Sequence, residues 1–395
     1  MKRLFVGTMC AGAVLALAAC GSSGSGSASS GSSGTIAIGA WSPLSGPIAP
    51  SGTQVTAGAK AAFDEVNAAG GINGKKIEYT TLDNAFDAQQ TIQTARKLVG
   101  EKKVVAIVGA DGTAATAAAF PYVLKQSKVP ILFTYGGSST WYDPPQAGLF
   151  GAQTLYENQA AALAGWAVSS GAKHIVVVHD DPAAFLNVAN HVVSAAKEKD
   201  PAIQTDLVPV KLNTTDYSPV VAQVKAKSPD AVVLILPVPE AAAYLKQAKL
   251  QGVTAQPYGY APDADPGLLK LAGDAAEGFR TLSLTKLPTD TADPAVAGYV
   301  AALKKSAPDQ VPSFYSIYSY AAAKAFIKIL QGIKGDITAA SISQAAESAS
   351  GIDTGLLPPL SFSADKHLGT DQVIRLTVTG GAFAAQGGFT SPTGS

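Results

Sequence analysis

Two short segments combine hydroxyl groups and glycine amides directly after expected strands, and the first of them also contains the acidic Asp111. Residues 109–113 read Gly-Ala-Asp-Gly-Thr, and residues 134–139 read Thr-Tyr-Gly-Gly-Ser-Ser. Each segment leads into an expected helix. Hydroxyls and free backbone amides at the start of a helix suit a carboxylate or another hydrogen-bond acceptor. The alternative is that Thr113 and Ser138 only cap their helices, which is a common role for these residue types.

Catalytic and metal-binding chemistry finds no comparable support in the sequence. The histidines have no metal-ligand spacing: they are His174, His179, His191 and His367. No strand–GxSxG–helix segment and no Walker loop occurs. We therefore expect no catalytic residue, no metal and no cofactor. Trp41, at the end of the first expected strand, could stack on a ligand or pack in the core.

The elements that must position these segments alternate between two patterns. Short apolar runs are typical of buried strands, and runs with helical spacing are typical of covering helices. Strands are expected at 36–41, 76–82, 104–108, 129–133, 174–179, 203–210, 231–236 and near Tyr258. Helices are expected from Ser51 and Asp87 (each with a glutamine three residues later, as in a capping box), from Thr113, about Tyr156 and Glu240, and at 185–197 and 220–227. Two such series favour two doubly wound α/β lobes whose parallel sheets are covered on both faces.

Composition limits what the folded part can bind. Lys plus Arg and Asp plus Glu each number 29, so nothing electrostatic points to nucleic acid. The apolar stretch at 317–330 is interrupted by Lys324 and Lys328, which argues against a membrane span. The cysteines are Cys10 and Cys20. We therefore expect a folded part without disulfides, which its size makes possible.

The amino terminus is typical of an export signal followed by a tether. Lys2 and Arg3 precede an apolar run over 4–19, too short for a comfortable transmembrane helix. The Leu-Ala-Ala-Cys ending at Cys20 resembles the lipobox of bacterial lipoproteins, which implies a signal peptide over 1–19 and lipid attachment to Cys20. The Gly/Ser segment over 20–34 then serves as a flexible tether. The alternative is ordinary secretion with cleavage near the same alanines.

Four strings of the mature chain resemble a known family. They are WSPLSG at 41–46, VNAAGGINGKKIE at 66–78, LDNAFDAQQTIQTARKLV at 82–99 and AGDAAEGF at 272–279. They look like the leucine/isoleucine/valine-binding proteins, the type I periplasmic binding proteins of ABC importers. The resemblance implies two Rossmann-like lobes joined by three crossovers, with the ligand between them.

The same resemblance implies the boundaries of the lobes. The first lobe is expected to take residues 35–154 and 283–352, and the second to take 155–282 and 353–385. Residues 386–395 are expected to form a flexible tail. In such α/β lobes the ligand lies outside the carboxyl ends of the strands, and two lobes can close on it as a hinge.

The resemblance also implies roles for the two loop segments. In the family, a hydroxyl of the first loop, and a backbone amide and a hydroxyl of the second, hold the carboxylate of an amino acid. By position, these roles fall to Thr113, Gly137 and Ser138. Phe86 and Gly112 stand where the family has paired cysteines.

The second lobe departs from the family pattern. Phe185 stands at one tyrosine position, and Pro237 or Val238 at another. Ala261 falls near the position of the acid that pairs with the ammonium of the ligand. Together Phe185, Val238 and Ala261 describe an apolar pocket wall.

The missing acid leaves two alternatives for the solute. An unpaired ammonium in a desolvated site is costly. Either another acid reaches the ligand, with Asp111, Asp263 and Glu240 as candidates, or the solute has no ammonium. On this basis we expect a compact amphipathic solute such as an aromatic or branched carboxylate or amide. Leucine remains possible if Asp111 or a nearby acid takes the ammonium.

The resemblance implies an extracytoplasmic solute-binding lipoprotein of an ABC importer. Its expected partners are a small solute, an ABC permease with its ATPase subunits, and the outer face of the cell membrane through the lipid. We expect a monomer that binds no nucleic acid. Two rival classes remain open. One is a lobe pair of the same fold that reports a ligand to a membrane receptor, and the other is a secreted enzyme.

Overall fold

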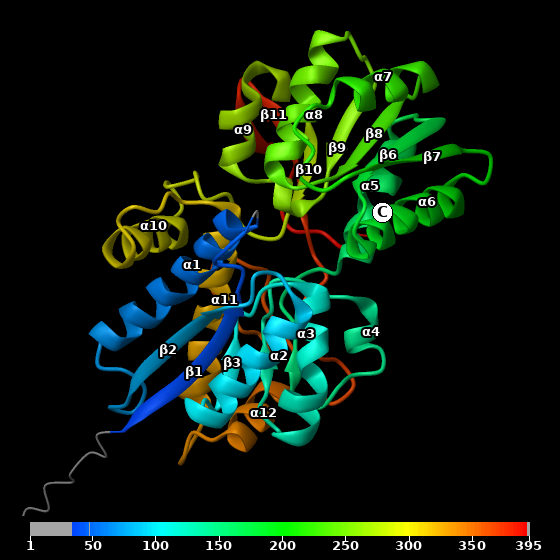
Figure 1. Cartoon of the computed structure of the whole chain (residues 1–395). Coiled ribbons are helices and arrows are strands. Elements are labelled where there is room, and N and C mark those ends of the chain that lie inside the picture. Colours follow the sequence, from blue (N-terminus) through cyan, green and yellow to red (C-terminus); the bar gives the residue numbers. More distant parts are fainter. Residues whose placement is uncertain (1–33, 47, 393–395) are drawn as a thin grey trace, which may run out of the picture.

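The structure is a computed structural model that describes residues 34–46 and 48–392. The expected signal peptide over 1–19, the lipid site at Cys20 and the tether up to residue 33 lie outside these residues. Within the described ranges, no helix is long and apolar enough to cross a membrane. The chain forms two α/β bodies, one below and one above in Figure 1, which confirms the expected fold class.

The first sheet is wholly parallel and has the order β2-β1-β3-β4-β5. Its strands are β1 (Thr35–Ser42), β2 (Lys76–Asp83), β3 (Ala106–Val108), β4 (Ile131–Leu132) and β5 (Leu149–Phe150). The expected strands over 104–108 and 129–133 are therefore present but shorter. Both faces are covered, because Ile36 and Ile38 belong to one buried cluster while Ile107 and Ile131 belong to another.

Helices cover both faces of this sheet (Figure 1). They are α1 (Ala49–Ala68), α2 (Ala88–Arg96), α3 (Thr113–Phe120) and the short α4 (Ser139–Tyr142). π-helical turns at Lys97–Glu101 and Pro121–Gln126 extend α2 and α3. Buried residues of α1 pack on one face, and buried residues that follow α2 and α3 pack on the other.

The two expected capping starts have different outcomes. Asp87 caps α2, since its carboxylate accepts a hydrogen bond of 2.7 Å from the amide of Gln90. The start expected at Ser51 is wrong, because α1 begins at Ala49 after Ile48 with no side-chain cap. Pro50 at the beginning of α1 explains the earlier start, since its fixed φ suits the first helical turn.

The second sheet has the order β12-β11-β10-β9-β8-β6-β7. Its strands are β6 (His174–Asp180), β7 (Gln204–Val210), β8 (Ala231–Ile235), β9 (Gln256–Gly259), β10 (Arg280–Ser283), β11 (Ile374–Thr379) and β12 (Ala382–Ala385). The expectation of a purely parallel sheet is wrong here, because β11 is antiparallel to β10 and to β12. The turn Gly380-Gly381 makes this possible, since both glycines have positive φ and join β11 to β12 as a hairpin.

Helices again lie on both faces of this sheet. They are α5 (Tyr156–Ser169), α6 (Ala183–Lys199), α7 (Ser218–Lys227), α8 (Val238–Leu250) and α9 (Pro266–Ala272), with 3₁₀ turns at Ala261–Asp263 and Gly273–Ala276. Along β6, Ile175 and Val177 pack in the cluster with α5 and α6, while Val176 and Val178 pack in the cluster with α7 and α8. This alternation is the period of two expected for a strand buried on both faces.

Three later helices return to the first body. They are α10 (Pro294–Ser306), α11 (Phe314–Gly332) and α12 (Ala339–Glu347). α11 crosses α1 closely at Gly58, where an added Cβ would lie 2.0 Å from the carbonyl oxygen of Ser316. The apolar stretch over 317–330 is thus a buried helix of the first body.

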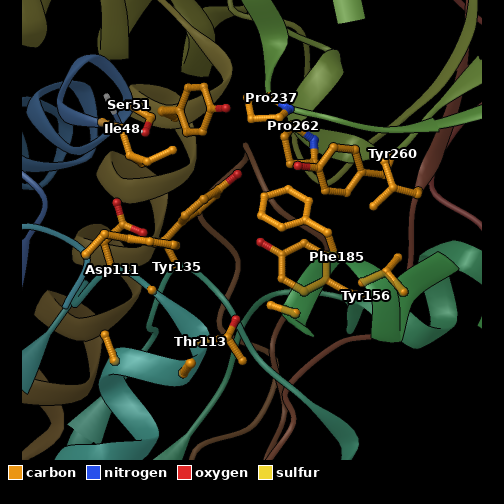
Figure 2. Close-up of a pocket in the computed structure, with 18 residues that line it drawn as sticks. Ile48, Ser51, Asp111, Thr113, Tyr135, Tyr156, Phe185, Pro237, Tyr260 and Pro262 are labelled. Atoms are coloured by element: carbon orange, nitrogen blue, oxygen red, sulfur yellow. Dashed lines mark hydrogen bonds between the residues drawn. The ribbon is translucent and has the colours of Figure 1, made fainter. Parts of the chain in front are cut away.

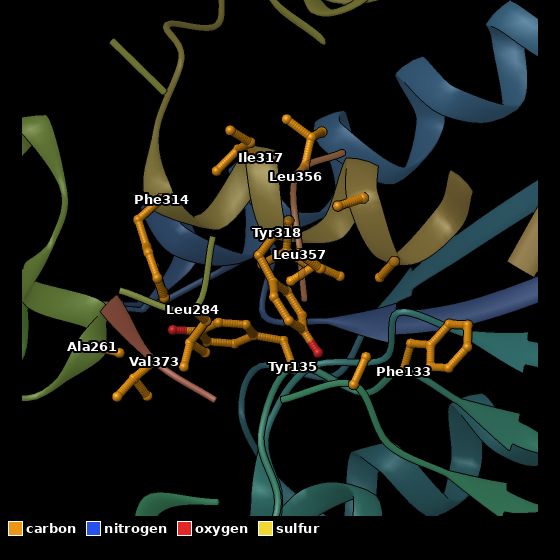
Figure 3. Close-up of a cluster of buried hydrophobic side chains, with 14 of the residues drawn as sticks. Phe133, Tyr135, Ala261, Leu284, Phe314, Ile317, Tyr318, Leu356, Leu357 and Val373 are labelled. Atoms are coloured by element: carbon orange, nitrogen blue, oxygen red, sulfur yellow. The ribbon is translucent and has the colours of Figure 1, made fainter. Parts of the chain in front are cut away.

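The chain passes between the two bodies three times: between β5 and α5, between β10 and α10, and between α12 and β11. Figure 3 shows the apolar junction there, where Leu284, Phe314 and Val373 approach Tyr135. Thr154 and Gln372, on two of the connections, are joined by a hydrogen bond of 2.8 Å.

Two expected boundaries need correction. The segment over 353–370 was expected in the second lobe, but Gly151 beside β5 pairs with His367 and Gly369, and Phe362 packs on Phe150. This part therefore extends the first body. The described part of the expected flexible tail is also paired, because Thr390 forms an antiparallel bridge with Val373.

Candidate functional site

A pocket lies where each sheet reverses its strand order. In the first sheet β1 lies between β2 and β3, and in the second β6 lies between β7 and β8. The chain therefore leaves β1 and β3 toward opposite faces, and likewise β6 and β8, which opens a crevice at the carboxyl ends of these strands. The two crevices face each other, and Figure 2 shows side chains from both bodies around the space between them.

The pocket has a volume of about 150 Å³. This is the size of a cavity that accepts a small ring or a branched aliphatic group. The first body contributes residues that follow β1, β2, β3 and β4, together with one residue of α11: Ile48, Ser51, Phe86, Asp111, Gly112, Thr113, Ala114, Ala115, Tyr135 and Tyr315. The second body contributes residues around α5, α6, β8 and β9: Tyr156, Ala184, Phe185, Val188, Ile235, Pro237, Tyr260 and Pro262.

Four tyrosines form much of the pocket wall: Tyr135, Tyr156, Tyr260 and Tyr315. The ring centroids of Tyr135 and Tyr315 are 5.4 Å apart, and those of Tyr156 and Tyr260 are 6.0 Å apart. Burial raises the pKa of all four hydroxyls, that of Tyr156 to about 12. The rings are therefore neutral at physiological pH and present π-faces and hydroxyl groups to the pocket.

Asp111 is the acidic side chain of the pocket lining. Only 4% of the residue is exposed, and among the described residues its Oδ2 atom has no hydrogen-bond partner. Burial raises the pKa of this carboxyl to about 7, while the Ser42 hydroxyl acts in the opposite direction. Within the described part of the lining there is no lysine, arginine or histidine. Asp111 is therefore the side chain of the described lining that can carry a full charge near neutral pH.

Of the three residues expected to hold a carboxylate, the structure places only Thr113 in the pocket wall. Its hydroxyl oxygen accepts a hydrogen bond of 3.2 Å from the amide of Gly137. Ser138 donates its hydroxyl to Oε1 of Glu157 at 3.0 Å. Gly137 and Ser138 thus connect the loop to neighbouring groups and are not among the residues that line the pocket.

Helix capping by these hydroxyls, the alternative interpretation, is also wrong. α3 follows Gly112 without a side-chain cap, and Thr113 is already its first residue. Ser138 precedes α4 but makes no capping hydrogen bond to it. The Glu157 carboxylate accounts for this, since it accepts hydrogen bonds from the Ser138 hydroxyl and from the amide and hydroxyl of Ser139.

The expected apolar wall of the second body is present in part. Phe185, near the start of α6, lines the pocket. Between the two residues considered for the next position, Pro237 lines the pocket and Val238 lies behind it in the core. Ala261 is fully buried between Tyr260 and Pro262, which do line the pocket, and its amide donates to Oε1 of Gln159.

The other two candidate acids do not reach the pocket. Asp263 is fully buried, and burial together with nearby Asp265 raises its pKa well above the ordinary value. Glu240 accepts hydrogen bonds from the Tyr217 hydroxyl and the amide of Asn213. Neither belongs to the lining. Of the three candidates, only Asp111 can approach a solute there.

Trp41 corrects another expectation. The residue is fully buried, packs with the helices on the far face of the first sheet, and donates its Nε1 hydrogen to Thr116 at 3.0 Å. It cannot stack on a solute in the pocket. Phe86 and Gly112, which the resemblance sets at the positions of a cysteine pair, lie together, since an added Cβ at Gly112 would be 3.2 Å from the Phe86 ring.

The sequence interpretation missed the tyrosines as a group. Tyr135 lies three residues after β4 and Tyr260 directly follows β9, so the position rule used for Thr113 could have identified them. Tyr315 belongs to α11, far away in the chain, and only the return of that helix to the first body brings it to the pocket.

Asp180 also lay outside the expected set: burial and nearby Glu240 raise its pKa to about 8, but it does not line the pocket.

In residues 34–46 and 48–392, no group of three or more His, Cys, Asp or Glu side chains is arranged to hold a metal ion. The lining itself offers a solute hydroxyl groups, one carboxyl group and apolar contacts.

Comparison with known sequences places this geometry in context. A family profile described as periplasmic binding protein matches residues 35–382. The Leu/Ile/Val-binding protein homolog 7 of Brucella abortus (strain 2308) is 28% identical over 340 residues, which cover 82% of this chain and 83% of the relative. An amino acid binding protein of Pseudomonas aeruginosa is 27% identical over 306 residues, 75% of this chain and 78% of the relative.

Solved structures share the fold at lower identity. A possible leucine/isoleucine/valine-binding protein from Rhodopirellula baltica has a TM-score of 0.81 and 22% identity, covering 91% of this chain and 98% of its own. A branched chain amino acid ABC transporter protein from Thermus thermophilus with bound valine has a TM-score of 0.82 and 19% identity, covering 91% and 97%. A fatty acid ABC transporter substrate-binding protein from Thermomonospora curvata has a TM-score of 0.79 and 21% identity, covering 91% and 92%. At these identities the likeness establishes the two-lobed fold alone.

Proposed function

This chain belongs to the periplasmic binding protein family, and from that premise we infer that it captures a small solute between its two lobes for an ABC importer. Members of the family are extracytoplasmic solute-binding proteins and not enzymes. The relatives named for amino acids, or for leucine, isoleucine and valine, support a solute of amino acid size. The solute would be amphipathic, because Ser51, Asp111 and Thr113 face a lining that is otherwise apolar and aromatic.

One observation carries this proposal: the pocket is lined from both bodies at the carboxyl ends of both sheets. A solute in this position contacts each lobe, so its binding favours the state in which the lobes are closed. We propose residues 35–154 with 283–370 as the first lobe and 155–282 with 371–392 as the second. The three connections near 154, 283 and 371 would act as the hinge.

A thermal-shift screen tests solute capture. The purified protein is heated with amino acids, amines, aliphatic and aromatic carboxylates, amides and polyols. A solute present at 100 times its Kd stabilises the folded state by about 2.7 kcal/mol. We expect at least one class to raise the melting temperature, and no rise with any class would contradict the proposal.

A matched pair of variants shows whether the solute occupies this pocket. Ala184 lines the pocket and is exposed, whereas its neighbour Ala183 is exposed and does not line it. Ala184→Trp should fill the pocket and abolish the stabilisation, and Ala183→Trp should retain it. Equal stabilisation of the two variants would place the solute elsewhere.

Lipid anchoring and delivery to a permease complete the proposed function. The motif at Cys20 supports a lipid anchor. The Gly/Ser segment supports a flexible tether, which would let the two lobes of a monomeric protein reach the permease. Cys20→Ala should release the protein from washed membranes, while Cys10→Ala should leave it bound. Membrane retention of Cys20→Ala would contradict the anchor.

A further inference from the structure

The pocket contains a buried carboxyl group with one oxygen atom that has no hydrogen-bond partner in the described chain. Asp111 is 4% exposed, lines the pocket, and its Oδ2 atom has no partner in the described chain. Buried polar atoms in folded proteins are almost always paired, so an unpaired carboxylate oxygen in a pocket indicates a missing partner from the solute.

No side chain in the described lining carries a positive charge. The hydroxyls of Tyr135, Tyr156 and Tyr315 are close enough to interact electrostatically with Asp111. Burial raises the pKa of all three, so they stay neutral. The amide of Gly137, which was expected to hold a carboxylate, already donates to Thr113. A carboxylate placed here would meet Asp111 without a compensating cation, and this is unfavourable in a desolvated site.

The aromatic residues favour the opposite charge. Tyrosine rings carry negative charge on their faces and attract ammonium groups within about 6 Å of the ring centroid, most strongly where water is excluded. The four pocket tyrosines come from both lobes, so a cation in the pocket would contact rings on each side. On the second lobe, Phe185, Ile235 and Pro237 leave room for an apolar remainder.

We propose that the solute carries a positively charged nitrogen that pairs with Asp111 of the first lobe and lies against the tyrosine rings, with its apolar part against Phe185 and Pro237. The proposal rests on the proposed function and names the solute class of that same pocket. Of the two alternatives left by the sequence, it selects the solute with an ammonium. Primary amines, amino acids with an apolar side chain and quaternary ammonium compounds belong to this class.

Calorimetry with matched probes tests the charge of the solute on the unmodified protein. Leucine is compared with isopentylamine, which lacks the carboxylate, and with isocaproate, which lacks the ammonium. Choline is compared with its neutral carbon isostere, dimethylbutanol. We expect isopentylamine to bind. Leucine and isopentylamine should each bind at least about tenfold more tightly than isocaproate, and choline at least about tenfold more tightly than dimethylbutanol, because only the tighter compounds carry a positive charge.

The contradicting results are distinct from failure of the proposed function. Tighter binding of isocaproate than of isopentylamine, or failure of both isopentylamine and choline to bind, would overturn the assignment of charge. Solute capture itself would still stand if another class stabilised the protein in the thermal screen.

A pair of variants tests the position of the charge. Asp111→Asn should weaken isopentylamine binding on the order of 30-fold, because it removes the partner of a buried cation while keeping the shape of the side chain. Asp263→Asn replaces another buried acid that does not line the pocket and should leave the affinity unchanged. Equal affinity in Asp111→Asn and the unmodified protein would show that Asp111 is not the partner.

Discussion

The two walls of the pocket differ in what they offer a solute. The wall of the first lobe contains Asp111, with an unpaired oxygen, and the hydroxyl of Thr113. The wall of the second lobe contains Phe185, Pro237 and Pro262, and its polar groups are tyrosine hydroxyls. Both walls follow from the same strand order, so the difference comes from side chains at equivalent places in the fold.

This comparison separates two properties of recognition. A charged group in a desolvated wall discriminates strongly between solutes, because the wrong charge leaves it unpaired. An apolar wall discriminates more weakly, by size and shape. We therefore expect changes in the first-lobe wall to affect charge selectivity, and changes in the second-lobe wall to affect apolar affinity.

The largest expected effect is on the pH dependence of stability. Burial raises the pKa of Asp111 from its ordinary 3.8 to about 7, so the folded state binds this proton more tightly than the unfolded state. The free energy of unfolding of the solute-free protein therefore falls as pH rises from about 4 to about 7. Asp111→Asn should remove this part of the fall and gain on the order of 2–4 kcal/mol relative to the unmodified protein at pH 8.

Urea unfolding at pH 4 and at pH 8 measures this difference. Asp309→Asn, at an exposed aspartate, serves as the control and should follow the unmodified protein at both pH values. The stability difference between Asp111→Asn and the unmodified protein should therefore change between the two pH values. The same difference at both would contradict a buried, ionisable carboxyl at Asp111.

The second effect concerns a contact between the two lobes outside the pocket. Glu157, on α5, accepts three hydrogen bonds from Ser138 and Ser139 of the first-lobe loop, at 3.0, 3.2 and 3.3 Å. Glu157→Ala should lower the free energy of unfolding by about 1.5–3 kcal/mol, since hydrogen bonds to a charged group are lost. Glu157→Gln keeps an acceptor oxygen and should lose less in the same chemical denaturation experiment. Equal losses would show that the hydrogen bonds do not matter.

The third effect tests how firmly the first-lobe loop is held. Gly136 has φ of 126°, and an added Cβ would lie 2.8 Å from the Thr113 hydroxyl oxygen. Gly136→Ala should cost on the order of 1–3 kcal/mol of stability, because alanine is strained at this φ. At Gly137 the nearest atom to an added Cβ is a flexible carbon of Leu155 at 3.3 Å, so Gly137→Ala should cost less. Thermal unfolding of the two variants compares them, and the reverse order would contradict the loop geometry.

The smallest effect belongs to the second-lobe wall. Phe185 is partly buried and lines the pocket, so Phe185→Ala should weaken an apolar ammonium solute such as isopentylamine by about tenfold with little change in stability. The neighbouring Leu186 is 37% exposed and does not line the pocket, so Leu186→Ala should bind normally. Calorimetry that finds the two variants alike would remove Phe185 from the wall.

The sequence predicted those parts of the site that depend on local order along the chain. Asp111 and Thr113 follow a strand and begin a helix, and the carboxyl ends of parallel strands form one edge, so their place at the pocket could be derived. Phe185 and the pair Pro237 and Val238 were singled out by the resemblance, since they stand at tyrosine positions of the family, and of that pair Pro237 lines the pocket.

The parts that failed depend on packing between distant segments. Trp41 has the right position along its strand, but the alternation of side chains turns it to the face covered by α2 and α3. Tyr315 reaches the pocket only because α11 crosses α1 at Gly58, and the segment after residue 353 joins the first body through Gly151. Periodicity along one segment contains no information about such partners.

The central claim is that a solute held between the two walls brings the lobes together. Small-angle scattering of the protein, free and with isopentylamine at saturation verified by calorimetry, measures this directly. We expect a smaller radius of gyration in the bound state and no change in Ala184→Trp, whose pocket is filled. An identical scattering profile of the free and the saturated protein would contradict the account.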